Sequence, residues 1–196
     1  MLRIFFIFIF IVNLSGCGYN DIQTYDEQTH SAWSEVLNQY QRRADLILNL
    51  VASIKGYASH EKEVLEAVTL ARAQANLASR KLQQAPDDAQ KLASWQQAQI
   101  QLTRSLGQLS IISERYPELK AQELYQNLII QLEGSENRIA VARGRYIKAI
   151  EKYNVTIRKF PAVMTAKVMN YQPKKNYLPD EAAAISKAPT IDFSQQ

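Results

Sequence analysis

Residues 33–61 read WSEVLNQYQRRADLILNLVASIKGYASHE, and this stretch decides the fold. Apolar side chains recur in it at alternating steps of four and three residues, which places them along one side of an α-helix. This seam consists of Trp33, Leu37, Tyr40, Ala44, Ile47, Val51, Ile54 and Ala58. Polar residues fill the positions between them. Such a pattern is typical of a helix in a helical bundle.

Three further segments carry stripes of the same kind, at about residues 60–84, 86–115 and 116–160. Gly56 offers a break after a first helix at about residues 25–55. Pro86 and Pro117 each fit the first turn of a helix and predict a helix start. Gln99 interrupts the third stripe. The last stripe has a seven-residue spacing and consists of Tyr125, Leu132, Ile139, Tyr146, Tyr153 and Phe160.

Helices of this length must bury their stripes against one another. A helix of roughly 40 residues is about 60 Å long and needs partners along its whole length. We therefore predict an all-α fold, an antiparallel bundle of four long helices over residues 25–160. Residues 161–196 contain several prolines and predict an irregular tail, with one short helical turn at 180–185 and with Tyr171, Tyr177 and Phe193 docked on the bundle.

The first 17 residues have the pattern of a targeting segment. Arg3 supplies a positive charge, residues 4–12 form an apolar run, and Ser15 and Gly16 directly precede the only cysteine, Cys17. The run is shorter than the about 20 apolar residues that span a bilayer. This combination predicts a bacterial lipoprotein signal peptide, residues 1–17, that ends at a lipidated Cys17. A short uncleaved anchor with an incidental cysteine is the alternative.

A lipidated Cys17 would fix the location of the protein. Two or three acyl chains hold a protein on a membrane persistently, whereas one chain binds only marginally. We expect residues 18–24 to tether the lipid to the bundle, which would face the periplasm of a bacterial cell envelope. Gly18 and Tyr19 lack the aspartate that resembles an inner-membrane retention signal, which favours the outer membrane if the source is Gram-negative.

The charge balance argues against nucleic acid as a partner. The chain has 196 residues, with 23 Lys and Arg, 19 Asp and Glu, and a formal net charge of +4. Nucleic-acid binding usually needs a clustered basic face rather than a small excess spread over the chain. Anionic membrane headgroups remain a weak candidate partner. With Cys17 used for lipid, no intramolecular disulfide is available.

The first polar group beside the apolar seam lies in the RRAD sequence. Arg42 and Asp45 are three residues apart and can pair on one helix surface. Alternatively, Arg42 and Asn49 could bind an anionic group, since guanidinium suits bidentate recognition.

The second polar group is the ENR sequence that begins at Glu136. A bridge from Glu136 to Arg42, Arg43 or Arg72 would set the helix register at little net stability. A ligand site between helices near Arg42 and Arg138 is the alternative. The candidate polar network or partner-binding set is Arg42, Arg43, Asp45, Asn49, His60, Glu61, Arg72, Glu136, Asn137, Arg138 and Arg143.

We predict no enzyme, no metal and no cofactor. His60 and Glu61 lie near further acidic residues, but metal sites in helical bundles use a Glu-x-x-His motif on each of two helices, and only His30 of the two histidines stands in one. The glycines form no phosphate-binding loop, and no serine stands in a Gly-x-Ser-x-Gly motif. Acidic residues at the start of a helix are explained by the helix dipole.

The RRAD stretch also carries a family resemblance. QRRADLILNLV followed by KGYASHE resembles the LemA family, bacterial envelope-associated helical proteins, and the resemblance covers about residues 25–193. Later segments agree in order and spacing: AR at Ala71–Arg72, ERYPELKA at Glu114–Ala121, ENRIAVAR at Glu136–Arg143, KYN at Lys152–Asn154 and KFP at Lys159–Pro161.

Two positions depart from the family pattern. Leu48 stands where members often have proline, and Arg145-Tyr146-Ile147 replaces a Tyr-Asn pair. An interior proline kinks a helix, so we expect Leu48 to make the first helix straighter.

The resemblance implies a membrane-attached helical protein rather than a particular activity. We expect a non-enzymatic scaffold or adaptor for an envelope protein, with a membrane protease or a TPM-domain protein as the partner that the resemblance suggests. A module that binds a small anionic or amphipathic ligand between helices is the alternative. A homo-oligomer is left open, because long stripes can be buried within one chain or across a dimer.

Overall fold

The structure, a computed structural model, describes residues 2–57, 60–86 and 88–175, with side chains from Gly18 onward. The all-α fold is confirmed, and the described residues contain no strand. The helices are α1 (Leu2–Lys55), α2 (Lys62–Gln84), α3 (Ala89–Arg115), α4 (Pro117–Lys120), α5 (Glu123–Thr156) and α6 (Ala162–Val168). Over the residues that the structure describes, none of these helices is long and apolar enough to cross a membrane.

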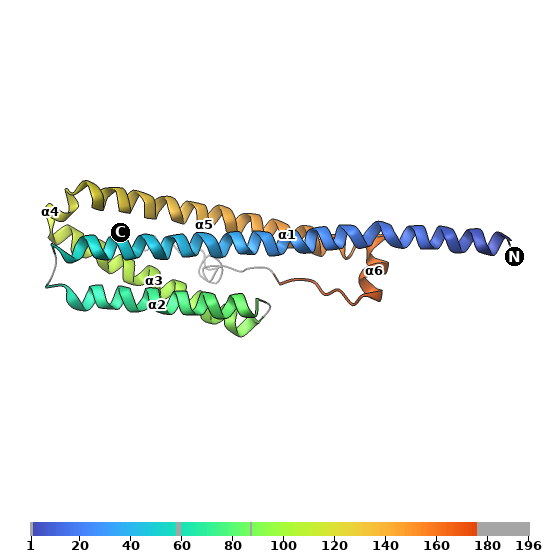
Figure 1. Ribbon diagram of the computed structural model, residues 1–196, viewed down its shortest axis with the longest axis horizontal. Helices are drawn as coiled ribbons and strands as arrows, with labels where there is room; N and C mark the ends of the chain where they lie inside the picture. The colour runs from blue at the N-terminus through green and yellow to red at the C-terminus, as the bar shows by residue number, and fades with distance from the viewer. Residues whose placement is uncertain (1, 58–59, 87, 176–196) are drawn as a thin grey trace, which may run out of the picture.

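The helices form an elongated rod (Figure 1). The longest, α1, packs mainly against α5, and α2 packs mainly against α3. Successive long helices run back and forth along the rod, and the short α4 connects α3 to α5 at one end (Figure 1). The first turns of α1 project beyond the opposite end, where α6 lies (Figure 1).

The predicted seam of the first helix is buried. Ile47 and Ile54 have no exposed surface, and Trp33, at the other end of the seam, is only 8 % exposed. The aromatic rings of Trp33, Tyr40 and Trp95 meet near the middle of the rod, with ring centres 5.5 Å apart between the tryptophans and 4.8 Å apart between Tyr40 and Trp95. Ala58 lies outside the described residues.

The first helix differs from the expected one at its beginning. α1 includes residues 18–24, which were expected to form a tether. The reason is that this segment carries its own buried contacts: Ile22 has no exposed surface and packs with Tyr153, Ile157 and Ala166. Because Ile22 is buried against the end of α5 and against α6, α1 continues as a helix through residues 18–24.

The fourth helix differs from the expected one at both ends. It divides into α4 and α5, because Gln122 is extended, with φ −72° and ψ 127°. α5 ends at Thr156, so Phe160 falls beyond it and is 75 % exposed instead of extending the stripe. Tyr125 and Tyr153 of the same stripe are buried as expected.

The two prolines that predicted helix starts behave differently. Pro117 is in the first turn of α4. Pro86 lies in the turn before α3, where Asp88 is the N-cap: its carboxylate accepts hydrogen bonds from the backbone nitrogens of Gln90 and Lys91, at 2.9 and 3.1 Å. The hydrogen bond from Lys91 and the one from Gln90 lower the pKa of Asp88 despite partial desolvation.

The part of the tail that is described docks on the bundle. The small side chains of Ala162 and Ala166 face α1, and Gln23 donates a hydrogen bond of 2.7 Å to the hydroxyl of Tyr171. The peptide bond before Pro161 is cis. The turn predicted at 180–185 and the docking predicted for Tyr177 and Phe193 lie outside the described residues.

Gly18 controls how closely α6 approaches α1. A Cβ atom at Gly18 would lie 2.5 Å from the Cα of Ala162, a contact that the backbone of α6 can relieve only by moving. Gly18→Ala should therefore loosen α6 and speed hydrogen exchange and proteolysis over residues 157–175. Gly107→Ala is the matched control, because its Cβ would meet open space and should stabilise α3 by about 0.5–1 kcal/mol. Equal protection of α6 in both variants would contradict this assignment.

Candidate functional site

A buried arginine joins three helices in the middle of the rod. Arg43 of α1 is 3 % exposed and donates from Nη1 to Glu136 Oε1 of α5 at 2.9 Å. Its Nη2 donates to Gln99 Oε1 of α3 at 2.7 Å, and its Nη1 also lies 3.4 Å from Thr103 Oγ1. The guanidinium carbon lies 5.0 Å from the centre of the Tyr40 ring. We call Arg43, Gln99, Thr103 and Glu136 the Arg43 cluster.

The Arg43 cluster explains why the third stripe is interrupted. A buried charge is tolerated only where it is paired and hydrogen-bonded. Gln99 is buried at a position that would otherwise carry an apolar residue, and its side-chain oxygen accepts from Arg43. The hydroxyl of Thr103 donates to the Gln99 backbone oxygen at 3.0 Å, which leaves its lone pairs facing Arg43. Gln99 therefore interrupts the apolar stripe because its side-chain oxygen is the acceptor for Arg43.

The Arg43 cluster is buried at the arginine and exposed to solvent at the glutamate. Arg43 is almost fully enclosed, whereas the side chain of Glu136 is 50 % exposed. Water therefore screens the carboxylate, which reduces both the Coulomb attraction and the desolvation cost. Such an arrangement contributes little net stability compared with an apolar core, but it accepts only one alignment of α1, α3 and α5.

Two smaller groups of polar contacts join α2 to its neighbours. Arg72 Nε donates to the backbone oxygen of Ala44 at 2.6 Å, and its Nη2 lies 3.6 Å from Asp45. Glu61 lies 3.0 Å from Arg115 Nη1 and accepts a longer hydrogen bond, 3.4 Å, from the hydroxyl of Tyr116. The first group joins the middle of α2 to α1, and the second joins the start of α2 to the end of α3.

The tail and the aromatic middle of the rod enclose a cavity of about 360 Å³. We call it the strap cavity and residues 172–175 the strap, because these four consecutive residues of the tail line it. The strap is held by Asn154, whose side chain exchanges two hydrogen bonds of 2.8 Å with the backbone of Lys174. The strap cavity is lined by Thr29, His30, Trp33, Pro86, Asp88, Ala89, Leu92, Tyr146, Tyr153, Gln172, Pro173, Lys174 and Lys175.

The strap cavity combines aromatic walls with cationic groups. Lys174 Nζ lies 2.9 Å from Asp26 and 5.2 Å from the centre of the Tyr153 ring. His30 lies 3.6 Å from the other oxygen of Asp26. Burial raises the pKa of the Tyr153 phenol, and the charges of Asp26 and Tyr171 raise it further, so this hydroxyl stays protonated near neutral pH.

The sequence of the chain matches a known family model. The LemA family model matches residues 32–193, which is most of the chain. The chain belongs to the LemA family. Two curated relatives are magnetosome proteins MamQ 1 and MamQ 2 of Paramagnetospirillum magneticum (strain ATCC 700264 / AMB-1). Each is 35 % identical over 57 residues, which cover 29 % of this chain and 21 % of the relative, so the match spans about a fifth of the length of these proteins.

The candidate residues of this LemA family member divide between the contacts above and the surface. Arg43, Glu136, Arg72, Asp45 and Glu61 make the cross-helix contacts already described. Arg42, Asn49, His60 and Asn137 are exposed. The bridge to Glu136 thus comes from Arg43, and Arg42 points outward.

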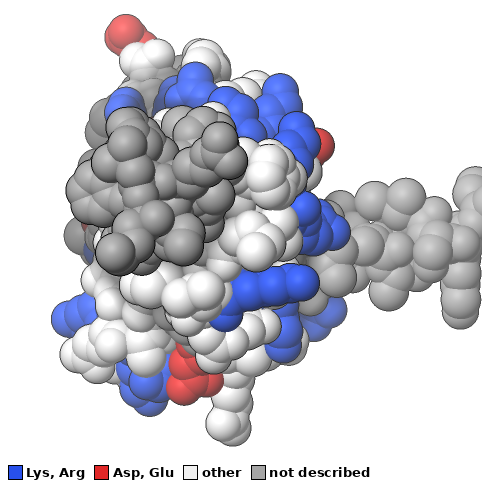
Figure 2. Space-filling view, turned by 90° about the vertical axis from the view of Figure 1, so that its right-hand side faces the viewer, with Lys and Arg blue, Asp and Glu red and all other residues white. Residues whose placement is uncertain are grey.

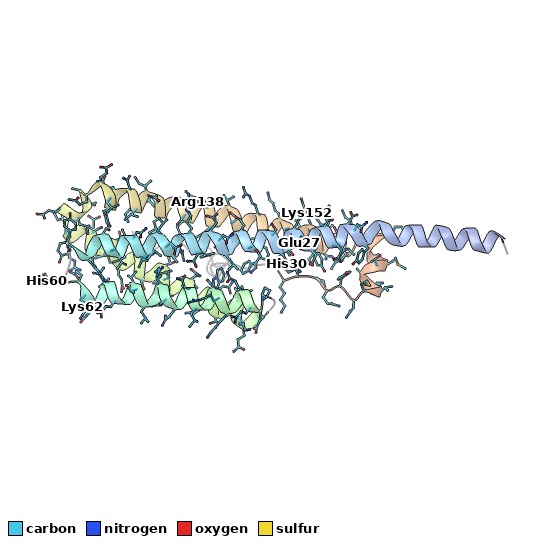
Figure 3. The ribbon with its side chains drawn as sticks, viewed as in Figure 1. Glu27, His30, His60, Lys62, Arg138 and Lys152 are labelled. Carbon is cyan, nitrogen blue, oxygen red and sulfur yellow. The ribbon has the colours of Figure 1, made fainter. Side chains whose placement is uncertain are left out.

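Arg138 and Arg143 both lie on α5 and are half-buried. Arg138 Nη2 reaches the backbone oxygen of Gln131 at 3.5 Å, on its own helix. Figure 3 shows Arg138 partway along α5 and His60 at the end of the rod, so the candidate residues do not form one site. Among the described residues, no group of three or more His, Cys, Asp and Glu could hold a metal ion.

Sequence reasoning missed the strap cavity. Its walls come from α1, α3, α5 and a tail that was expected to be irregular. The only signal in the sequence was the paired Lys174 and Lys175 next to Tyr171, and spacing alone could not place them against α1.

The two neighbouring arginines should differ sharply in their effect on stability. Arg43→Ala is expected to lower the free energy of unfolding by about 2–4 kcal/mol, because it removes charged hydrogen bonds and leaves the buried Gln99 oxygen unpaired. Arg42→Ala, on the exposed side of the same helix, should change it by less than about 0.5 kcal/mol. Asp45, at 60 % exposure, should behave like Arg42. Urea denaturation of the variants measures the difference, and equal losses for Arg42 and Arg43 would refute it.

Proposed function

We propose that this LemA family member is a non-enzymatic, lipid-anchored scaffold of the cell envelope that holds a protein-binding end away from the membrane. The observation that carries the proposal is the difference between the two ends of the rod. The apolar N-terminal run projects from one end (Figure 1), and three strongly exposed aliphatic side chains lie toward the other. Ile111 near the end of α3 and Leu124 and Ile130 in the first turns of α5 are each 64 % exposed.

The length of the rod supports this division of roles. From Gly18 to Lys55, α1 rises by about 55 Å at 1.5 Å per residue. Exposed aliphatic residues at one end of a protein are typical of sites that contact another protein. A rod of this length would present them well clear of the lipid headgroups.

The interior of the rod also supports a structural role. A ligand site between helices near Arg42 would need polar groups that face a space between the helices. Arg43 instead binds Gln99 and Glu136, and Arg42 is exposed to solvent. An arginine whose two Nη groups are bound by its own neighbours favours fixed register over ligand capture. Membrane proteases and TPM-domain proteins are the partner classes that family membership suggests, and Cys17-Gly18-Tyr19 favours the outer membrane over the inner one if the source is Gram-negative.

Photocrosslinking in cells tests the scaffold proposal. A photoreactive amino acid at position 124 or 130 should give a crosslink to one envelope protein, because these positions lie at the distal end. Val141 of α5 is a matched control, an aliphatic residue that is 54 % exposed and lies in the second half of that helix, away from the distal end. The same crosslinks from position 141, or none from 124 and 130, would count against a distal binding end.

A ligand-binding module is the second candidate, and the strap cavity favours it. Its volume of about 360 Å³ falls within the usual range for small-molecule sites, roughly 300–1,000 Å³. Aromatic walls from Trp33 and Tyr146 with Lys174 and Lys175 at the rim suit a small anionic amphiphile. The cavity lies away from Arg42 and Arg138, the residues that sequence analysis considered.

Thermal unfolding in the presence of decanoate or decyl phosphate tests the second candidate. Binding to the folded state raises the melting temperature with ligand concentration. The rise should be lost in Lys175→Glu, at the cavity rim, and kept in Lys148→Glu, an exposed lysine of α5 outside the cavity lining. No rise in the unmodified chain, or an equal rise in both variants, would exclude the strap cavity as an anionic-ligand site.

A further inference from the structure

The short helix α6 has an unusual distribution of side chains. A surface helix normally buries large apolar residues and exposes polar ones. In α6 the residues facing α1 are the small Ala162 and Ala166, while Met164 is 61 % exposed and Val168 is 85 % exposed. These two pairs lie on opposite faces, because positions two residues apart are about 200° apart around a helix.

Two neighbouring residues enlarge the exposed apolar surface. Phe160, just before α6, is 75 % exposed, and Met169, just after it, is 51 % exposed. Phe160, Met164 and Val168 follow one another at four-residue steps. We call Phe160, Met164, Val168 and Met169 the α6 patch. A cluster of large apolar side chains on the surface marks a site that another apolar surface covers.

Basic residues surround the α6 patch. Between Lys152 and Pro179 the sequence has six Lys and Arg residues and no Asp or Glu. Lys159 and Lys167 are exposed, and no ion pair joins either to an acid among the described residues. Figure 2, which views this end of the rod, shows several Lys and Arg side chains among other residues and few acids. Long basic side chains beside apolar ones suit a layer of anionic headgroups over acyl chains.

The position of α6 along α1 selects a membrane as the covering surface. α6 packs against Gly18, six residues beyond the end of the apolar run at Val12. Six residues of helix rise by about 9 Å, so α6 lies about 9 Å along α1 from the end of the apolar run. This distance is comparable to the thickness of the interfacial layer, about 5–10 Å, in which interfacial helices bury their apolar faces. If Cys17 carries the lipid instead, the acyl chains begin one residue from Gly18. Either attachment therefore brings the α6 patch to the bilayer surface.

We infer that the α6 patch and its basic rim are a second membrane contact, which lays α6 on an anionic phospholipid surface and sets the tilt of the rod. The anchor alone leaves the rod free to swing. A second contact on one side of α1 restricts that swing and keeps the distal end at a defined height. This inference rests on the membrane attachment that is part of the proposed function.

Spin-label accessibility on the full chain tests the inference. Val168→Cys is spin-labelled in the lipidated chain, in which the thioether of Cys17 does not react with the label, and the protein is reconstituted into vesicles of phosphatidylethanolamine and phosphatidylglycerol. The label should gain collisions with oxygen and lose collisions with a water-soluble nickel chelate. Ile111→Cys, at the distal end and 64 % exposed, is the matched control and should remain open to nickel.

Charge reversal separates the anionic contact from simple burial. Lys159→Glu with Lys167→Glu should restore nickel collisions at position 168, whereas Lys55→Glu with Lys62→Glu, two exposed lysines at the far end, should not. Protection at 168 that is equal in phosphatidylcholine vesicles and insensitive to the reversal would overturn the anionic surface. Protection that grows with protein density, with coupling between labels, would instead assign the α6 patch to a second copy of this chain.

Vesicle flotation of the chain with Cys17 intact, purified from bacterial membranes, keeps this result distinct from the proposed function. If this chain does not float, membrane attachment is contradicted, and with it both proposals. A chain that floats with position 168 as open to nickel as position 111 overturns only the second contact.

Discussion

The apolar seam of α1 is the constraint on which the rest of the structure depends. A helix this long has little stability of its own in water and must be covered along its length by tertiary contacts. α5 covers most of it, and α2 and the tail cover the remainder. The position of every other element follows from this requirement: α2 returns along α1, α3 reverses again, and α4 turns the chain so that α5 can lie beside α1. Even the tail is held by residues of α1 such as Ile22 and Gln23.

An apolar seam fixes which faces meet, but it does not by itself fix the register. Neighbouring layers of Leu, Ile and Ala are similar enough that a shift by one heptad would bury a similar area. The Arg43 cluster removes this ambiguity. Only one alignment brings Gln99 and Glu136 to the guanidinium of Arg43, and any other would leave a buried charge without partners. A half-exposed Glu136 keeps the cost of that specificity low.

Much of this fold could be predicted from the sequence, for a physical reason. Helical periodicity is a local property, so the seam from Trp33 to Ile54 predicted burial that the structure confirms. Helix limits were less predictable. Residues 18–24 are helical because Ile22 finds a pocket formed by distant residues, and Phe160 is exposed because the chain leaves α5 early. Both depend on contacts between segments far apart in sequence.

The candidate site was less predictable for the same reason. Two adjacent arginines are equivalent in a sequence, but a rotation of 100° between them sends Arg43 into the bundle and Arg42 into solvent. The interruption at Gln99 was visible, yet its meaning depends on the distance to Arg43, which only packing sets. The strap cavity is a stronger case, since Asn154 and the backbone of Lys174 meet across 20 residues of turn and short helix.

The two ends of the rod differ in which side chains they bury and which they expose. At the distal end, Leu119 is fully buried while Ile111 and Leu124 remain exposed, so the packing of the core does not account for these exposed residues. At the other end, Gly18 lets α6 approach closely and the small Ala162 and Ala166 fill the contact, which leaves the larger side chains of α6 outside. A helix that needed only to cap the bundle would bury Met164 and Val168 and expose its alanines. Exposing the larger side chains is favourable only where the outer face of α6 is itself covered. The proposed membrane contact would cover it, because α6 lies at the end of the rod nearest the apolar run (Figure 1).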